Sequence, residues 1–127
     1  MLERDLCDFI ILGKPEQVHA LAKGRAADVS KATIIDPRTA RDLDEMVALL
    51  TSLRKSKGMT EAKARELLCG DYTWYGTLMM HQNKADGMVS GACHTTADTM
   101  RPAMQIIKTA PGIGLVSSAF FMLLPDR

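Results

Sequence analysis

The stretch GMVSGACHTTADTMRPAMQIIKTAPG, residues 87–112, runs from a short apolar segment through small and hydroxyl-bearing residues into a helical pattern. Residues 88–89 are expected to form a very short strand. Because proline is tolerated only in the first turn of a helix, Pro102 predicts a helix from about residue 98 to 109. Residues 90–97 are then an irregular loop between strand and helix, which we call the elbow.

Helices and apolar strands alternate on both sides of the elbow. The expected strands are 9–12, 32–36, 88–89 and 115–124, and the expected helices are 15–24, 40–58, 60–68, 73–83 and 98–109. Thr60 is the expected N-cap of the third helix. In the second helix, one buried stripe is predicted from the residues at helical spacing, which are Leu43, Met46, Val47, Leu50 and Leu53. The first strand is a continuous apolar run, which is typical of a strand buried on both faces of a parallel sheet. This order predicts an α/β fold, a three-layer domain in which helices cover both faces of a mostly parallel sheet.

Composition excludes several classes of function. The 127 residues suit one domain with a modest core, and 46% hydrophobic with 24% charged residues is an ordinary globular composition. The net charge is +1, from 16 basic and 15 acidic residues, so no excess charge favours nucleic acid or an anionic membrane. We therefore expect no nucleic-acid or membrane partner.

The cysteines, the apolar tracts and the N-terminus indicate the cellular compartment of the protein. The three cysteines are odd in number and form no CxxC pair, which argues against a disulfide framework or a zinc site. The longest apolar tract, Ile113–Leu124, is too short to span a bilayer, and the acidic N-terminus does not resemble a secretory signal. We expect a cytoplasmic protein without a bound metal.

The elbow has the groups that an anion site needs. A helix N-terminus offers unpaired N–H groups and a partial positive charge. Arg101 adds a planar cation suited to phosphate oxygens, and Gly91 lets the backbone approach a ligand closely. The hydroxyl donors are Ser90, Thr95, Thr96 and Thr99. A second cationic cluster at Arg54–Lys57 is either a solvated helix end or another anion contact.

A plainer interpretation of the elbow is also open. Serine, threonine and aspartate before a helix are common caps without any ligand, and Asp98 with Arg101 could form a surface ion pair. Taken alone, these residues favour the cap over the anion site. The adjacent Cys93 and His94 do not by themselves make a nucleophilic pair, because such a pair needs a particular geometry.

A family resemblance favours the anion site over the plain helix cap. The segment ADGMVSGACHTTADTMRPAMQIIKTAPG resembles the signature segment of the phosphate acetyl/butyryltransferase family, and in particular of phosphate acetyltransferases. The similarity extends to DFIILGKPEQV, ATIIDP, LLTSLRKSKGMTEAKARELL, YGTLMM and VSSAFFMLLPD, and so covers nearly the whole chain. The rival relatives are phosphate butyryltransferases and the acetyltransferase-like domain fused to malic enzymes. A non-catalytic phosphate-binding remnant is the alternative outside the enzymes.

The resemblance implies a reaction and a fold. The reaction is reversible acetyl transfer between acetyl phosphate and coenzyme A, by direct attack of the thiol on the acetyl carbonyl. Coenzyme A is a substrate there, and no cofactor or metal is needed. The implied fold resembles isocitrate and isopropylmalate dehydrogenases, with the active site in a cleft between two α/β domains. The complete enzyme is expected to be a homodimer.

The resemblance also assigns roles to residues. Thr95 and Thr96 stand where the family's Ser-Thr pair meets the phosphate group, and Arg101 matches its catalytic arginine. Ser90 is a further substrate-binding candidate. Arg54, or its neighbour Lys55, falls where a second basic contact to substrate is expected.

The resemblance further implies that the chain is a central portion of the enzyme. Residues 1–112 are expected to be part of its first α/β domain, and residues 113–127 to begin the following segment or a second domain. The family's catalytic aspartate, with a neighbouring serine and arginine, is expected outside these residues. On this expectation the chain alone lacks part of the active site.

Overall fold

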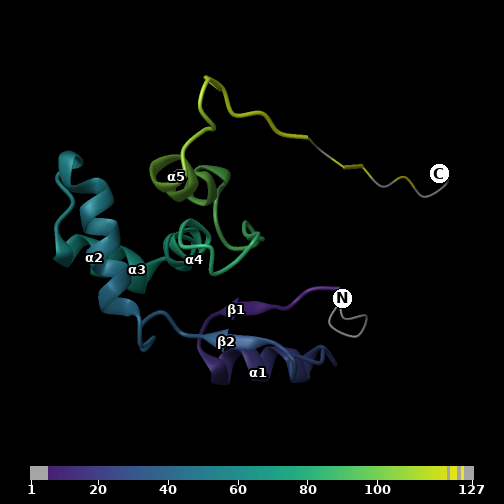
Figure 1. The fold of residues 1–127 in the computed structure, drawn as a ribbon. Coiled ribbons are helices and arrows are strands. Elements are labelled where there is room, and N and C mark those ends of the chain that lie inside the picture. The colour runs from purple at the N-terminus through teal and green to yellow at the C-terminus, as the bar shows by residue number, and fades with distance from the viewer. Residues whose placement is uncertain (1–5, 120, 123, 125–127) are drawn as a thin grey trace.

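The computed structural model describes residues 6–119, 121–122 and 124. Within them the fold is α/β, and α1 lies on the opposite side of the strands from α4 (Figure 1). The elements are, in chain order, β1 (Ile10–Leu12), α1 (Pro15–Gly24), β2 (Thr33–Ile35), α2 (Leu43–Arg54), the 3-10 helix η2 (Lys55–Lys57), α3 (Glu61–Gly70), α4 (Tyr72–His81) and α5 (Thr96–Ile106).

The first two expected strands form a parallel pair connected through α1. Ile11 lies opposite Ile34 in the ladder. Gly13 extends the pairing, because its N–H donates to the carbonyl of Ile35 over 2.9 Å. The prediction that the first strand is buried on both faces is wrong, because Ile10 is 39% exposed.

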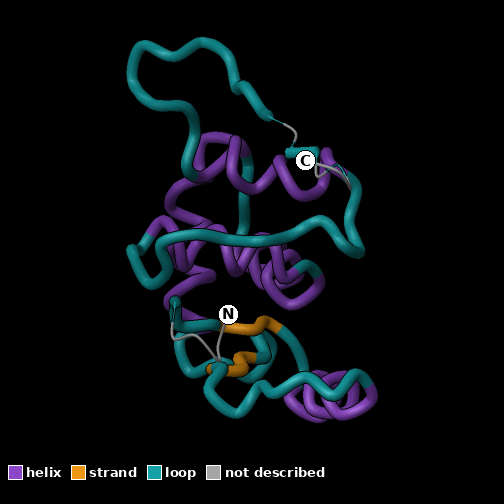
Figure 2. Tube along the Cα trace, turned by 90° about the vertical axis from the view of Figure 1, so that its right-hand side faces the viewer, coloured by secondary structure: helices purple, strands orange, loops and turns teal. Residues whose placement is uncertain are grey.

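The other two expected strands are not observed. Residues 88–89 are irregular, and the side chain of Val89 is fully exposed. The described residues of 115–124 are exposed and without regular structure, and positions 120 and 123 lie outside the described residues. A strand forms only where a neighbour pairs with its backbone groups, and this segment extends away from β1 and β2 (Figure 2). The sheet of the described residues therefore contains two of the four expected strands.

The core lies among the helices. Four of the five stripe residues predicted on α2 are buried, and the fifth, Leu53, is 40% exposed. Helix α4 is apolar almost all round and is buried along most of its length, which places it at the centre of the core. The buried hydrophobic residues are Leu43, Met46, Val47, Leu50, Ala64, Leu68, Trp74, Tyr75, Leu78, Met79 and Ile106.

Gly76 allows α4 to pack closely against β1 and the segment before the elbow. A Cβ atom at this position would lie 2.8 Å from the Met88 sulfur and 3.2 Å from Leu12 Cδ1. The helix runs through this glycine, whose low helix propensity is outweighed by burial of the surrounding residues. Gly76 is therefore a packing position that links the strand layer to the elbow.

A buried tyrosine joins α4 to the start of α2. The Tyr75 hydroxyl donates to one oxygen of Asp42, and Lys84 pairs with the other at 2.9 Å. Burial alone would raise the pKa of Asp42, but the hydrogen bonds from Tyr75 and Lys84 and the charge of Lys84 lower it below its usual value. Burial, and then the contact with Asp42, raises the pKa of Tyr75 above its usual value.

The lowered pKa of Asp42 predicts a pH dependence of stability. A carboxylate whose pKa falls on folding contributes stability above its unfolded value of about 3.9, and that contribution is lost as pH falls through the folded pKa. Asp42→Asn should therefore cost about 1 kcal/mol in the free energy of unfolding at pH 7 and clearly less near pH 2. Urea denaturation at both pH values tests this, with Asp44→Asn, which breaks an exposed pair with Arg65, as the control. An equal cost at both pH values would contradict it.

Candidate functional site

The elbow ends in a capped helix start. Thr95 is the N-cap of α5, and its hydroxyl oxygen accepts the N–H of Asp98 over 3.2 Å. Helix α5 therefore begins at Thr96, two residues before the predicted start. The expectation that Pro102 belongs to the first turn is wrong, because the cap at Thr95 outweighs the one hydrogen bond, to the Asp98 carbonyl, that this proline cannot make.

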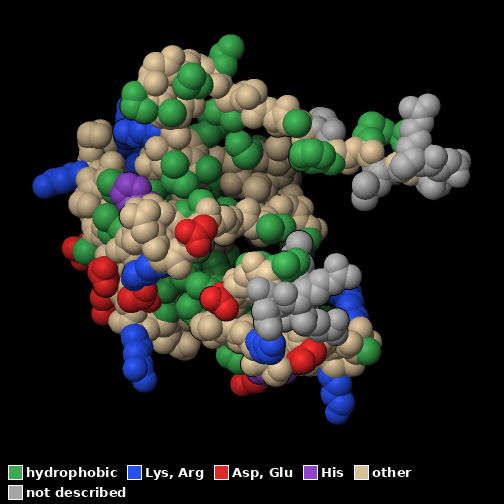
Figure 3. Space-filling model, turned by 45° about the vertical axis from the view of Figure 1, so that its right-hand side comes forward, with side chains coloured by type: hydrophobic (Ala, Val, Ile, Leu, Met, Phe, Trp, Pro, Cys, Tyr) green, Lys and Arg blue, Asp and Glu red, His purple; other side chains and the backbone are tan. Residues whose placement is uncertain are grey.

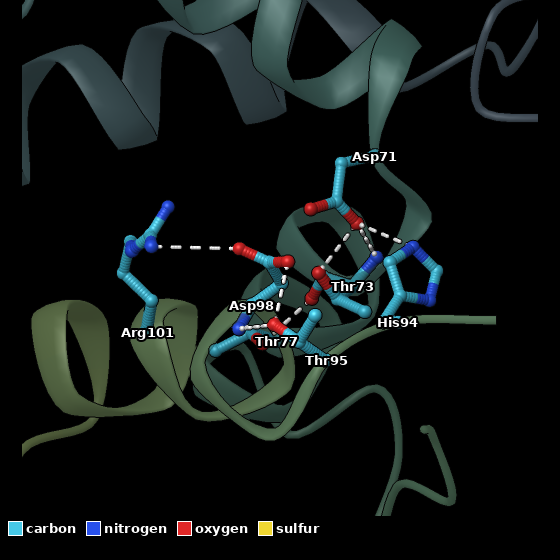
Figure 4. A network of polar contacts seen from close by, with 7 residues as sticks. All are labelled: Asp71, Thr73, Thr77, His94, Thr95, Asp98 and Arg101. Carbon is cyan, nitrogen blue, oxygen red and sulfur yellow. Dashed lines mark hydrogen bonds and ion pairs between the residues drawn. The ribbon is translucent and has the colours of Figure 1, made fainter. Parts of the chain in front are cut away.

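Asp98 joins two of the predicted site residues. The Thr95 hydroxyl donates to Asp98 Oδ2 over 2.7 Å, and a guanidinium nitrogen of Arg101 lies 3.4 Å from Asp98 Oδ1 (Figure 4). The surface ion pair of the plainer interpretation is thus present. Arg101 makes no other ion pair or hydrogen bond within the described chain, and its side chain is 56% exposed. Its remaining N–H groups can therefore reach a ligand.

A contact between His94 and Asp71 joins the elbow to the start of α4. His94 Nε2 lies 3.5 Å from Asp71 Oδ1. Asp71 is the N-cap of α4, and the same oxygen accepts the N–H of Thr73 over 2.9 Å. The Thr73 hydroxyl also donates to Asp71, and the four side chains of Asp71, Thr73, Thr77 and His94 lie next to the start of α5 (Figure 4). His94 in the elbow thus pairs with the N-cap residue of α4, and no hydrogen bond in the described residues joins it to Cys93.

Asp71 is not among the predicted site residues, although one local feature points to it. An aspartate immediately before an apolar helical run is a preferred N-cap. The contact with His94 has no local signal, because residues 71 and 94 meet only through the packing of α4 against α5.

Replacing Asp71 should destabilise the fold by way of α4. Asp71→Ala removes the cap and the His94 contact, and we expect a loss of about 1–2 kcal/mol in the free energy of unfolding. Asp71→Asn keeps the capping oxygen and should cost less than half as much. Urea denaturation of both variants measures this. Two variants as stable as the unchanged protein would show that the cap is dispensable.

Backbone and hydroxyl geometry leave room at the elbow. Gly91 has a φ of 117°, a backbone conformation that residues with a Cβ atom rarely adopt. A Cβ atom there would lie 4.0 Å from Thr99 Oγ1, and this hydroxyl is buried without a hydrogen-bond partner in the described chain. A buried hydroxyl without a partner is unusual in proteins, so Thr99 is a further available donor beside the elbow.

The remaining predicted residues differ in their surroundings. Ser90 and Thr96 are exposed, and their side chains make no hydrogen bond within the described chain. Arg54, at the end of α2, is partly buried, and its Nε is buried without a partner. It makes no hydrogen bond or ion pair with the elbow in the described residues. The structure thus joins Thr95 and Arg101 but does not connect Arg54 to them.

The described part of the structure also has two pockets outside the elbow. One pocket of about 490 Å³ lies between η2 and α3, and its lining includes Lys57, Met59, Lys63 and Leu67. Another of about 320 Å³ lies on the outer side of α5 and is mainly apolar. The described ranges contain no cluster of three or more residues able to hold a metal. They also contain no helix long and apolar enough to cross a membrane.

Comparison with known sequences identifies relatives along the whole chain. Residues 1–127 match the family model described as phosphate acetyl/butaryl transferase. A phosphate acetyltransferase from Salmonella typhimurium is 49% identical over 126 residues, which are 98% of this chain and 17% of that protein. One from Corynebacterium glutamicum is 42% identical over 127 residues, 100% of this chain and 38% of that protein. The chain thus spans about a sixth to two fifths of the length of these relatives.

Solved structures agree with the sequence matches. A phosphotransacetylase from Staphylococcus aureus has a TM-score of 0.80 at 44% identity, over 92% of this chain and 35% of that one. A phosphotransacetylase from Streptococcus pyogenes has a TM-score of 0.81 at 42% identity, over 89% of this chain and 34% of that one. The chain therefore belongs to the phosphate acetyl/butyryltransferase family.

Proposed function

We propose that this chain supplies the phosphate-binding part of a phosphate acetyltransferase site. The observation that carries the proposal is the cluster at the start of α5. There a hydroxyl and a guanidinium, from Thr95 and Arg101, lie on either side of one carboxylate at a helix N-terminus. The named relatives in the comparison are phosphate acetyltransferases, which favours acetyl over butyryl transfer.

The reaction needs the charge of the leaving phosphate to be held. The sulfur of coenzyme A forms a bond to the acetyl carbon, while the carbon–oxygen bond to phosphate breaks. The electron pair of that bond leaves with the phosphate. The thiol proton ends on the released phosphate, so the reaction balances. The first N–H groups of α5, at Thr96 and Ala97, have no helical acceptor and are available to phosphate oxygens. Arg101 supplies positive charge where the phosphate leaves.

The other groups fit around this cradle. Ser90, Thr96 and the buried hydroxyl of Thr99 supply further donors at or beside the elbow. Arg54 provides a second basic contact to substrate from the end of α2. Fixed donors of this kind lower the barrier without reorganising during the reaction, and holding the two substrates together accounts for much of the remaining acceleration.

Family membership supports a wider proposal for the whole enzyme. Coenzyme A is a substrate, acyl transfer needs no metal or other cofactor, and the complete enzyme is a cytoplasmic homodimer. Residues 1–112 belong to a first α/β domain of the kind found in isocitrate and isopropylmalate dehydrogenases, and residues 113–127 begin the next segment. Exposed hydrophobic side chains along residues 113–124 are consistent with packing against further protein (Figure 3).

Acetyl-CoA formation tests the proposed function. The full-length protein is incubated with coenzyme A and either acetyl phosphate or butyryl phosphate, and thioester formation is followed. We expect turnover with acetyl phosphate and slower turnover with butyryl phosphate. Faster turnover of butyryl phosphate would make the protein a butyryltransferase. Phosphate binding without thioester formation from either substrate would leave only a non-catalytic binding module.

A further inference from the structure

Asp98 contacts two of the residues that are proposed to bind phosphate, Thr95 and Arg101. Its two carboxylate oxygens contact different partners: Oδ2 accepts from the Thr95 hydroxyl and Oδ1 faces the Arg101 guanidinium. We propose that Asp98 is a positioning residue, which holds Arg101 beside the start of α5 so that the guanidinium meets the incoming phosphate group. This inference rests on the proposed function.

Arg101 needs such a partner. Its side chain is long and 56% exposed, and Asp98 is its one polar partner in the described residues. A free arginine side chain samples many rotamers, and fixing it on binding costs free energy. Because Asp98 lies three residues earlier on the same helix, it draws the guanidinium towards the first turn, where Thr95 lies. The ordering is then present before substrate binds.

The length of the contact leaves Arg101 available. A charge-assisted hydrogen bond between nitrogen and oxygen is usually 2.7–2.9 Å long, whereas the Asp98–Arg101 distance is 3.4 Å. Arg65 on α3, by contrast, donates a short hydrogen bond to Asp44 on α2. Asp98 therefore orients Arg101 without using its donors, so phosphate oxygens can bind them while the carboxylate stays in place.

A purely structural role for Asp98 makes a different prediction. The Thr95 side chain caps α5 by accepting the N–H of Asp98, and its hydroxyl is held by the Asp98 carboxylate, so this pair stabilises the helix whether or not Arg101 is present. If capping were the whole role, loss of the charge would have the same effect with and without the arginine. A positioning role requires that the effect depend on Arg101.

A double-mutant cycle in the full-length protein separates the two roles. Asp98→Asn keeps an oxygen for Thr95 and removes the charge that faces Arg101. We expect it to lower kcat/KM for acetyl phosphate about tenfold and to weaken the affinity for inorganic phosphate, measured by calorimetry, by a similar factor. The KM for coenzyme A should stay within about twofold. In the Arg101→Ala background, the same substitution should change each quantity by less than about twofold.

Several outcomes would overturn the proposal. Equal effects of Asp98→Asn in both backgrounds would mean that Asp98 acts on the helix alone. Tighter phosphate binding by Asp98→Asn would mean that the carboxylate only competes with the ligand. Asp44→Asn, which removes a comparable exposed pair, should leave all values unchanged. Failure of the proposed function would look different, because the unchanged protein would then form no acetyl-CoA.

Discussion

Arg101→Ala in the full-length protein is expected to lower kcat/KM for acetyl phosphate by about a hundredfold or more. The substitution removes the cation that balances charge on the departing phosphate, and loss of one such donor typically costs this much. The fold should be preserved, because the side chain is exposed and its ion pair with Asp98 contributes little to stability. Steady-state kinetics with acetyl phosphate, together with thermal unfolding, measures both effects.

Arg65→Ala is the matched control for this substitution. Arg65 is also an exposed arginine paired with an aspartate. It lies on α3, and its partner Asp44 lies in the first turn of α2, whereas Arg54 is the last residue of that helix. Its replacement should leave kcat/KM within about twofold. If Arg101→Ala were as active as Arg65→Ala, the phosphate-binding role assigned to Arg101 would be wrong.

Leu50→Ala is expected to cost about 2–5 kcal/mol in the free energy of unfolding. Leu50 is fully buried on α2, and removing a buried leucine side chain loses its transfer free energy and leaves a cavity. The core that contains Leu50 also holds α4 in place, and α4 packs against α5. Urea denaturation of the variant measures the loss.

Leu53→Ala is the control on the same helix. Leu53 is one turn further along and 40% exposed, so its truncation should cost less than about 1 kcal/mol. Equal costs for the two substitutions would contradict the placement of the core between α2 and the other helices.

Local rules were sufficient for most of the helices. The 3.6-residue spacing on α2 predicted four buried residues correctly, and Thr60 was correctly predicted to cap α3. Such features depend on residues within one or two turns of each other. The same locality explains why Pro15 and Gly24 were correctly placed at the two ends of α1.

Strand prediction failed where a strand needs a distant partner. Residues 115–124 have a suitable composition, yet their described part is exposed and unpaired. The apolar composition of a segment does not show whether another strand lies beside it to pair with its backbone. The predicted start of α5 is wrong for a different reason: the cap at Thr95 sets the start, and Pro102 is accommodated inside the helix.

The candidate site was predicted only in part. Thr95 and Arg101 were identified through the family resemblance, and their shared contact with Asp98 follows the spacing of one helical turn. The pairing of His94 with Asp71 depends on how two helices pack, which no local pattern indicates. Arg54 was predicted as a second contact, and its relation to the elbow remains a prediction.

A crystal structure of the full-length protein with inorganic phosphate bound tests the central claim most directly. We predict phosphate at the start of α5, with oxygens within hydrogen-bond distance of the Thr95 or Thr96 hydroxyl and of the Arg101 guanidinium. Asp98 should remain beside Arg101 in that structure. Phosphate bound only elsewhere, for example in the pocket beside Lys57 and Lys63, with an unoccupied elbow, would contradict the account.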